Sequence, residues 1–159
     1  MAPLIVLLAT FVLAVFAIRV IKKDYDLPLA ARIAMSVMLL FTSIGHFIFT
    51  RGMTMMMPDF IPFKTQMVYF TGLLEILAAI GLHIPKLRVL TSWLLILFFV
   101  LLLPANINAA LKHVDYQKGT FEGSGANYLW FRVPLQVLFI VWTYLSSIKY
   151  WNPLNETKR

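Results

Sequence analysis

Five polar side chains that could bind a ligand or carry a proton occur within or beside long apolar stretches of this 159-residue sequence. They are His46, Glu75, Asn106, Arg132 and Gln136. An ionisable group is costly inside a bilayer, so within a membrane span it marks a candidate functional site. A few such groups placed in an apolar cavity suffice to fix the orientation of a small molecule.

The composition excludes a soluble fold. Apolar residues make up 60% of the chain and charged residues 13%, against about 45–50% and about 25% in soluble domains. Cysteine is absent, which excludes disulfides, thiolate metal sites and cysteine nucleophiles. Lys and Arg exceed Asp and Glu by 14 to 7, and in a membrane protein this excess indicates topology rather than binding to nucleic acid.

The hydrophobic pattern predicts an all-α, polytopic membrane protein that forms a single domain over residues 1–159. A helix needs roughly 20 mainly apolar residues to cross a bilayer. Five segments meet or approach this length, at about residues 2–20, 29–49, 66–82, 89–104 and 128–149. Two long loops are expected at residues 50–65 and 105–127, whereas the other connections are short and favour antiparallel neighbours.

The distribution of basic residues predicts the orientation. One side of the membrane receives nine of them, Arg19, Lys22, Lys23, Arg32, Lys86, Arg88, Lys149, Lys158 and Arg159. The other side receives five, Arg51, Lys64, Lys112, Lys118 and Arg132. The positive-inside rule then places the N-terminus outside and the C-terminus in the cytoplasm, with a bacterial cytoplasmic membrane as the expected location. The glycosylation-like triplet Asn155-Glu156-Thr157 falls on the cytoplasmic side, so we interpret it as a chance match.

Polar residues fall on one face of three of the five spans at the helical repeat of about 100° per residue. The stripes comprise Arg32, Ser36, Ser43, His46 and Thr50; Thr71, Gly72, Glu75, Ala78 and Ala79; and Arg132, Gln136, Thr143, Ser146 and Ser147. The simplest arrangement is a four-helix bundle of the second to fifth spans, in which the stripes converge. The first span, which has no such stripe, is an additional N-terminal transmembrane helix packed outside.

The depth of these side chains predicts a polar pocket in the outer half of the bundle. At a rise of about 1.5 Å per residue, Glu75 lies about 13 Å below the outer surface, and Gln136 lies at the same level. Arg132 is shallower and long enough to reach a carboxylate. His46 and Asn106 complete the expected pocket. The alternative is structural: Glu75 is paired with Arg132 or protonated, and the other polar groups bind the helices to one another.

Other chemistries find less support in the sequence. His46 and His113 are expected near the outer surface and His83 near the inner one, which does not suit a haem held by two histidines. The methionines between Met53 and Met57 could bind Cu(I), although they could equally pack at the membrane surface. Phosphate-loop and metalloprotease motifs are absent from the sequence, so we assign no catalytic residue and no metal site. The cofactor is undetermined, with a quinone as a candidate.

Five segments in order resemble the DoxX-like family of small membrane proteins. They cover residues 41–47, 57–62, 72–75, 104–107 and 129–136, and all five pocket residues lie within them. The resemblance implies a four-helix core over residues 29–148. It also implies relatives as diverse as quinone-linked oxidation subunits, partners of oxidative-stress enzymes and cargo receptors.

The leading hypothesis is a non-catalytic or accessory membrane protein. It would bind a small lipophilic ligand, or a partner membrane protein, through the outer pocket, and could form a homo-oligomer. A quinone-linked oxidoreductase subunit and a proton-coupled transporter built around Glu75 are the alternatives.

Overall fold

The computed structural model describes residues 2–149, and within this range the chain is helical without a β-strand. The helices are α1 (Ala2–Lys22), α2 (Leu27–Ile48), α3 (Thr50–Met56), α4 (Lys64–Gly81), α5 (Arg88–Leu101), α6 (Leu103–Leu111), α7 (Ala126–Tyr144) and the π-helical turn η1 (Leu145–Lys149). The predicted all-α class is therefore confirmed. The C-terminal end and the Asn155-Glu156-Thr157 triplet lie outside the described residues.

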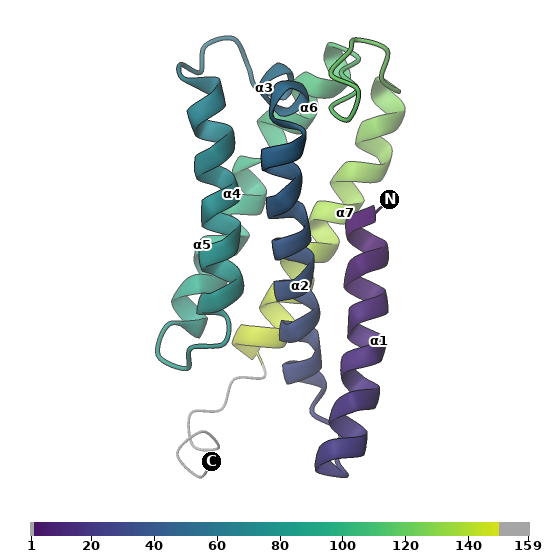
Figure 1. Cartoon of the computed structure of the whole chain (residues 1–159), viewed down its shortest axis with the longest axis vertical. Coiled ribbons are helices and arrows are strands. Elements are labelled where there is room, and N and C mark those ends of the chain that lie inside the picture. Colours follow the sequence, from purple (N-terminus) through teal and green to yellow (C-terminus); the bar gives the residue numbers. More distant parts are fainter. Residues whose placement is uncertain (1, 150–159) are drawn as a thin grey trace.

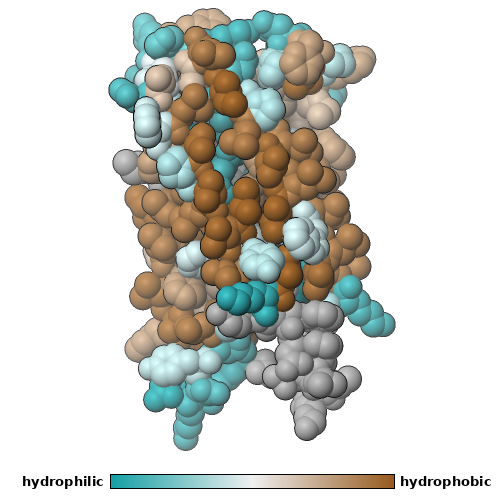
Figure 2. All heavy atoms as spheres, turned by 180° about the vertical axis from the view of Figure 1, so that it is seen from behind, coloured by the Kyte–Doolittle hydropathy of each residue, from teal (hydrophilic) through white to brown (hydrophobic). Residues whose placement is uncertain are grey.

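Four helical segments within residues 2–149 are long and apolar enough to cross a membrane. They are Ala2–Lys22, Leu27–Ile48, Arg88–Leu111 and Ala126–Lys149. Figure 2 shows the corresponding surface, with hydrophobic side chains over the middle of the molecule and hydrophilic ones gathered toward its two ends. Helix α4, expected as the third span, is not among these segments, because Lys64, Gln66 and Glu75 lower its hydropathy.

The long helices alternate in direction (Figure 1). The connections at residues 23–26 and 82–87 lie at one end, called here the lower end, and the segments around α3 and α6 lie at the upper end. Helices α2, α4, α5–α6 and α7 form the four-helix bundle, with α4 packed against α2. Helix α1 packs on α2 from outside the bundle, as the lack of a polar stripe predicts.

Two of the predicted boundaries are wrong in the same way, because both expected loops begin with helix. Residues 50–56 form α3 rather than loop, and residues 105–111 belong to α6. Pro104 does not end the helical segment, since it lies in the first turn of α6, where a missing N–H costs nothing. Asn106 and Asn108 are therefore held on a helix.

The polar stripes face inward, as predicted. Buried polar side chains include Ser36 and Ser43 on α2, Glu75 on α4, and Gln136 and Thr143 on α7. Beside them lies the apolar core, built from buried side chains of five helices, Leu7, Met35, Met38, Leu39, Ala79, Leu95, Phe99, Leu135 and Phe139 among them.

The helices α2 and α7 are tied together at the lower end of the bundle. Arg32 Nη1 donates a hydrogen bond to the carbonyl oxygen of Ser146 at 3.2 Å. One turn away, Trp142 Nε1 donates to the carbonyl oxygen of Ala31 at 3.0 Å, and Phe11 of α1 packs edge-on against the Trp142 ring at 5.0 Å. Helix α1 therefore covers the α2–α7 junction in its lower part.

Two adjacent leucines on α2 test this packing. Leu39 is fully buried in the core, whereas Leu40 is 44% exposed on the outer surface. Leu39→Ala should lower the free energy of unfolding by about 1–3 kcal/mol, because the cavity it leaves loses van der Waals contacts that lipid cannot replace. Leu40→Ala is the matched control and should change it by less than about 0.5 kcal/mol. Chemical or thermal unfolding in bicelles measures both, and equal effects would contradict the described orientation of α2.

Candidate functional site

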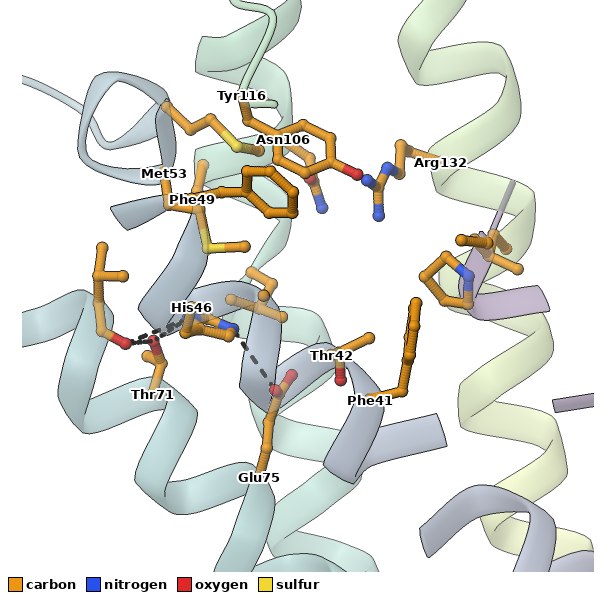
Figure 3. A pocket seen from close by; sticks show the side chains of 18 of the residues that line it. Phe41, Thr42, His46, Phe49, Met53, Thr71, Glu75, Asn106, Tyr116 and Arg132 are labelled. Carbon is orange, nitrogen blue, oxygen red and sulfur yellow. Dashed lines mark hydrogen bonds and ion pairs between the residues drawn. The ribbon is translucent and has the colours of Figure 1, made fainter. Parts of the chain in front are cut away.

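All five side chains predicted to form a pocket line one cavity of about 270 Å³ in the upper half of the bundle. Residues of α2, α3, α4, α5, α6 and α7 surround it, together with Ala2 and Pro3 of α1 (Figure 3). Most of its wall is apolar, contributed by side chains such as Met38, Phe99 and Leu135. The cavity thus combines a hydrophobic wall with a few polar groups, which is the usual character of a small-molecule site.

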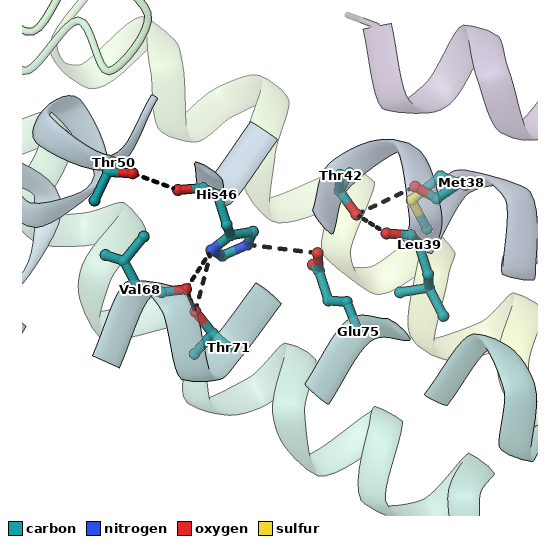
Figure 4. Close-up of polar contacts among 8 residues, drawn as sticks. All are labelled: Met38, Leu39, Thr42, His46, Thr50, Val68, Thr71 and Glu75. Carbon is teal, nitrogen blue, oxygen red and sulfur yellow. Dashed lines mark hydrogen bonds and ion pairs between the residues drawn. The ribbon is translucent and has the colours of Figure 1, made fainter. Parts of the chain in front are cut away.

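His46 and Glu75 form the polar floor of this cavity. Nε2 of His46 lies 3.5 Å from Oε2 of Glu75, and both side chains are largely buried. On its other side, the imidazole Nδ1 is 3.1 Å from the carbonyl oxygen of Val68 and 3.1 Å from the hydroxyl of Thr71 (Figure 4). The sequence predicted both residues of the pair as pocket residues and Thr71 only as part of the inward stripe, whereas in the structure Thr71 also contacts the ring.

These contacts orient the His46 ring and leave one Glu75 oxygen open. A carbonyl oxygen only accepts, so the hydrogen bond to Val68 is made by the tautomer of His46 that carries a hydrogen on Nδ1. The Thr71 hydroxyl also donates to this carbonyl, at 2.8 Å. Nε2 of His46 and Oε2 of Glu75, 3.5 Å apart, lie within ion-pair distance but do not form a hydrogen bond, so Oε2 stays open to a donor inside the cavity.

A glycine permits this contact between α2 and α4. A side-chain carbon on Gly72 would lie 2.9 Å from the Cβ atom of His46, closer than packed atoms allow. Gly72 precedes Glu75 by one helical turn on the same buried face of α4. The small residue in the predicted stripe therefore sets the distance at which the carboxyl meets the imidazole.

Two buried acceptor atoms face the cavity without a hydrogen-bond donor in residues 2–149. They are Oε2 of Glu75 and Oε1 of Gln136. The Gln136 amide is fixed at its other end, where Nε2 donates to the carbonyl oxygen of Phe99 at 3.1 Å. An unsatisfied buried acceptor costs about 1–3 kcal/mol, so both atoms call for a hydrogen-bond donor inside the cavity.

Arg132 does not pair with Glu75, which corrects one of the two structural roles considered for the carboxyl. Its guanidinium carbon lies 5.4 Å from the centre of the Tyr116 ring and 5.1 Å from that of Tyr128. Figure 3 places Arg132 beside Tyr116 and Asn106, on the opposite side of the cavity from Glu75. The aromatic faces attract the cation at the upper end of the cavity and hold it away from the floor.

The upper end of the cavity is lined by Phe49, Tyr116, Tyr128 and Arg132, which we call the aromatic lid. Phe49 packs edge-on against Tyr116, with 6.1 Å between ring centres. The Tyr128 hydroxyl donates to Oδ1 of Asn106 at 3.1 Å, which connects the lid to α6. Sequence reasoning placed Arg132 and Asn106 in the pocket but missed the rings. Tyr128 could have been found from its position one turn before Arg132, whereas nothing local indicates Tyr116.

The segment that carries Tyr116 is packed tightly onto α3. Gly52 of α3 is buried against the backbone of Tyr116, and a side-chain carbon there would overlap the Tyr116 carbonyl oxygen. Asn108 Nδ2 of α6 adds a hydrogen bond to the carbonyl oxygen of Met56 at 2.9 Å. These contacts hold the aromatic lid against the end of α2.

The histidines of the described part of the chain are not gathered with acidic side chains into a metal site. Among the described residues, no three His, Cys, Asp or Glu side chains are grouped in a way that could hold a metal ion. His83 and His113 are engaged elsewhere, His83 with the Ser36 hydroxyl at 3.0 Å and His113 near the Gly123 carbonyl at 3.4 Å. Met53, Met56 and Met57 line the upper part of the cavity, where they add to its apolar wall.

The chain matches a family described as a domain of unknown function, DUF8561, over residues 35–147. It belongs to that family. The match begins within α2 and contains all five cavity residues predicted from the sequence, whereas α1 lies outside it. Neither the curated proteins nor the solved structures include one that matches this DUF8561 chain.

An acidic side chain joins the two upper loops beside the lid. Asp59 accepts from Lys112 at 2.6 Å and from Lys64 at 3.1 Å, so it connects the end of α6 to the start of α4. The hydrogen bond from Lys112, followed by that from Lys64, holds the pKa of Asp59 below its ordinary value of 3.8.

The bridge at Asp59 predicts a specific titration. Because its folded-state pKa is lowered, the contribution of Asp59 to stability is present above pH 3.8 and is lost as the pH falls through the lowered pKa. Nuclear magnetic resonance should place the Asp59 midpoint below 3.8, and Lys112→Gln should raise it more than Lys64→Gln does. Lys118→Gln is the control, since Lys118 lies near Asp115 instead. If the titration midpoint of Asp59 were the same in Lys112→Gln as in the wild type, the bridge would be contradicted.

Proposed function

We propose that this protein binds a small amphiphile in the upper cavity, with a hydrogen-bond-donating head against Glu75 and Gln136. The observation that carries the proposal is the pair of buried acceptor oxygens without donors, set in a mostly apolar cavity. A hydroxyl or amine head would supply the missing donors, and an alkyl or ring portion would contact the methionine, phenylalanine and leucine side chains of the wall.

The polar groups also indicate which heads would be rejected. A carboxylate head offers only hydrogen-bond acceptors, whereas Glu75 and Gln136 need a donor. Its negative charge would also lie next to the Glu75 carboxyl. Arg132 does not offset this repulsion, because its guanidinium is held at the opposite end of the cavity by two tyrosine rings. The favoured ligand is therefore neutral or cationic at its head.

The proposed setting is a bacterial cytoplasmic membrane with the lower end of the molecule in the cytoplasm. Supporting it, seven of the twelve Lys and Arg residues within residues 2–149 lie at the lower end, around the connections at residues 23–26 and 82–87 and at the end of η1 (Figure 1). This orientation puts the N-terminus outside and the cavity in the outer half of the bilayer. The resemblance of five ordered segments to DoxX-like proteins supports a place among such small membrane proteins.

A head-group comparison tests the proposal. Hexadecanol should raise the melting temperature of the wild-type protein in detergent, whereas hexadecyl methyl ether, which lacks the donor, should raise it much less. Glu75→Gln should weaken hexadecanol binding by about tenfold, since a hydrogen bond to a charged group is worth about 1.5–3 kcal/mol. Gln136→Met, close in volume but without an amide oxygen, should also weaken it.

The matched control is Glu122→Gln, which neutralises an exposed carboxyl outside the cavity. It should leave hexadecanol binding unchanged. Equal stabilisation by the alcohol and the ether, or by wild type and Glu75→Gln, would show that the acceptors do not bind the head, and the proposal would fail.

A quinone-linked oxidoreductase subunit is the second candidate function. The observation that favours it is the close approach of two groups that can each hold a proton, His46 and Glu75, at the floor of the cavity, because quinol chemistry requires a group that can exchange a proton with the ring hydroxyl. Decylubiquinol, which donates hydrogen bonds, should then stabilise the protein more than decylubiquinone. His46→Gln should remove this difference, and a preference for the quinone would count against the second candidate.

A further inference from the structure

The cavity has a second side, away from the aromatic lid, where α2 and α7 separate. At the lower end the two helices are joined through Arg32 and Trp142. Toward the upper end α7 leans away from α2 (Figure 1), and both helices contribute lining residues to the cavity between them, such as Thr42 and Gln136. The cavity is therefore bounded sideways by the α2–α7 junction.

Side chains at this junction belong to the cavity and to the outer surface at once. Phe41, Ile44 and Ile48 of α2 line the cavity, yet they are 43%, 57% and 66% exposed. Figure 3 shows Phe41 in the space between α2 and α7, below Arg132. Ala2 and Pro3 of α1 line the same space from the lower side. The lining of the cavity thus extends from Glu75 to exposed apolar side chains on the side surface of the bundle.

This side surface lies in the part of the molecule that faces lipid. α2 is one of the helices long and apolar enough to cross a membrane, and its exposed residues here are aliphatic or aromatic. The upper end, by contrast, is covered by Phe49 against Tyr116 and by the Arg132 guanidinium over two rings. Gly52 allows the lid segment to sit directly on α3. The lid rings of Phe49, Tyr116 and Tyr128 are less exposed than Phe41, Ile44 and Ile48 on the lateral side.

We propose that the ligand enters and leaves sideways between α2 and α7, directly from the bilayer, and that its alkyl chain extends through this opening into the lipid. This inference rests on the proposed function and adds the substrate class, a single-chain membrane amphiphile with a donor head. The route explains how a cavity of about 270 Å³ can serve such a molecule: the cavity holds the head and the first part of the chain, and the rest stays in hydrocarbon.

Exchange kinetics test the route. Retinol, a fluorescent polyene alcohol, is the probe, delivered in phosphatidylcholine vesicles to the full chain in proteoliposomes. Energy transfer from the protein's four tryptophans reports binding. Ile44→Trp, at the opening, should slow association and dissociation by the same factor, on the order of ten, and leave Kd nearly unchanged, because it narrows a passage without touching the polar floor.

Leu40→Trp is the matched control, one turn from Ile44, 44% exposed and outside the cavity lining. It should leave both rates at the wild-type value. Phe41→Ala provides the opposite change and should accelerate both rates, which keeps the test decisive if Ile44→Trp folds poorly.

Two results together would overturn the lateral route and identify the aromatic lid as the entrance. The exchange rates would be unchanged in Ile44→Trp and Phe41→Ala, and they would rise in Tyr116→Ala. The same holds if Leu40→Trp slows exchange as much as Ile44→Trp. In these cases retinol still binds, so the proposed function survives. If wild type binds neither retinol nor hexadecanol, the proposed function fails, and the lateral route fails with it.

Discussion

The cost of placing a carboxyl group in the middle of an apolar helix bundle governs the upper half of this protein. Glu75 is buried, and an isolated charge there would be expensive enough to exclude it. Protonated His46 offsets part of that cost, because its Nε2 lies within ion-pair distance of the carboxyl, at 3.5 Å. The partnership requires α2 and α4 to approach closely, which Gly72 permits, and requires the imidazole to be oriented, which Val68 and Thr71 accomplish.

This arrangement leaves the carboxyl only partly satisfied, and the imbalance gives the cavity its chemical character. One Glu75 oxygen and the Gln136 carbonyl oxygen accept no hydrogen bond from the described residues. The single large cation nearby, Arg132, is drawn to the tyrosine rings of the aromatic lid instead. The cavity therefore has an acceptor-rich floor and a cationic, aromatic roof, and a neutral donor head fits the floor better than an anion does.

Helices α2 and α7 lie close together at the lower end of the bundle and apart at the upper end, because different polar contacts act at the two ends. Below, Arg32 and Trp142 join α2 to the carboxyl-terminal part of α7 and η1. Above, α7 contacts the α6 segment through Tyr128 and Asn106, and α2 is free to diverge from it. The cavity occupies the space between these two sets of contacts. The DUF8561 match, over residues 35–147, contains the upper set and the α7–η1 side of the lower set, whereas Ala31, Arg32 and α1 precede it.

The sequence by itself determined the all-α membrane class, the peripheral place of the first helix and the five polar residues that line the cavity. It could do so because burying polar groups in hydrocarbon is so unfavourable that helical phase alone indicates which face turns inward. It did not determine that Arg132 turns to Tyr116 and Tyr128 while His46 pairs with Glu75. That choice depends on the distances between helices and on a ring carried by the segment after α6, neither of which leaves a local pattern in the chain. Likewise, hydropathy did not predict that the two segments expected as loops begin as helix, in α3 and in the second half of α6; in the structure α3 packs on Tyr116, and Asn108 of α6 donates a hydrogen bond to Met56.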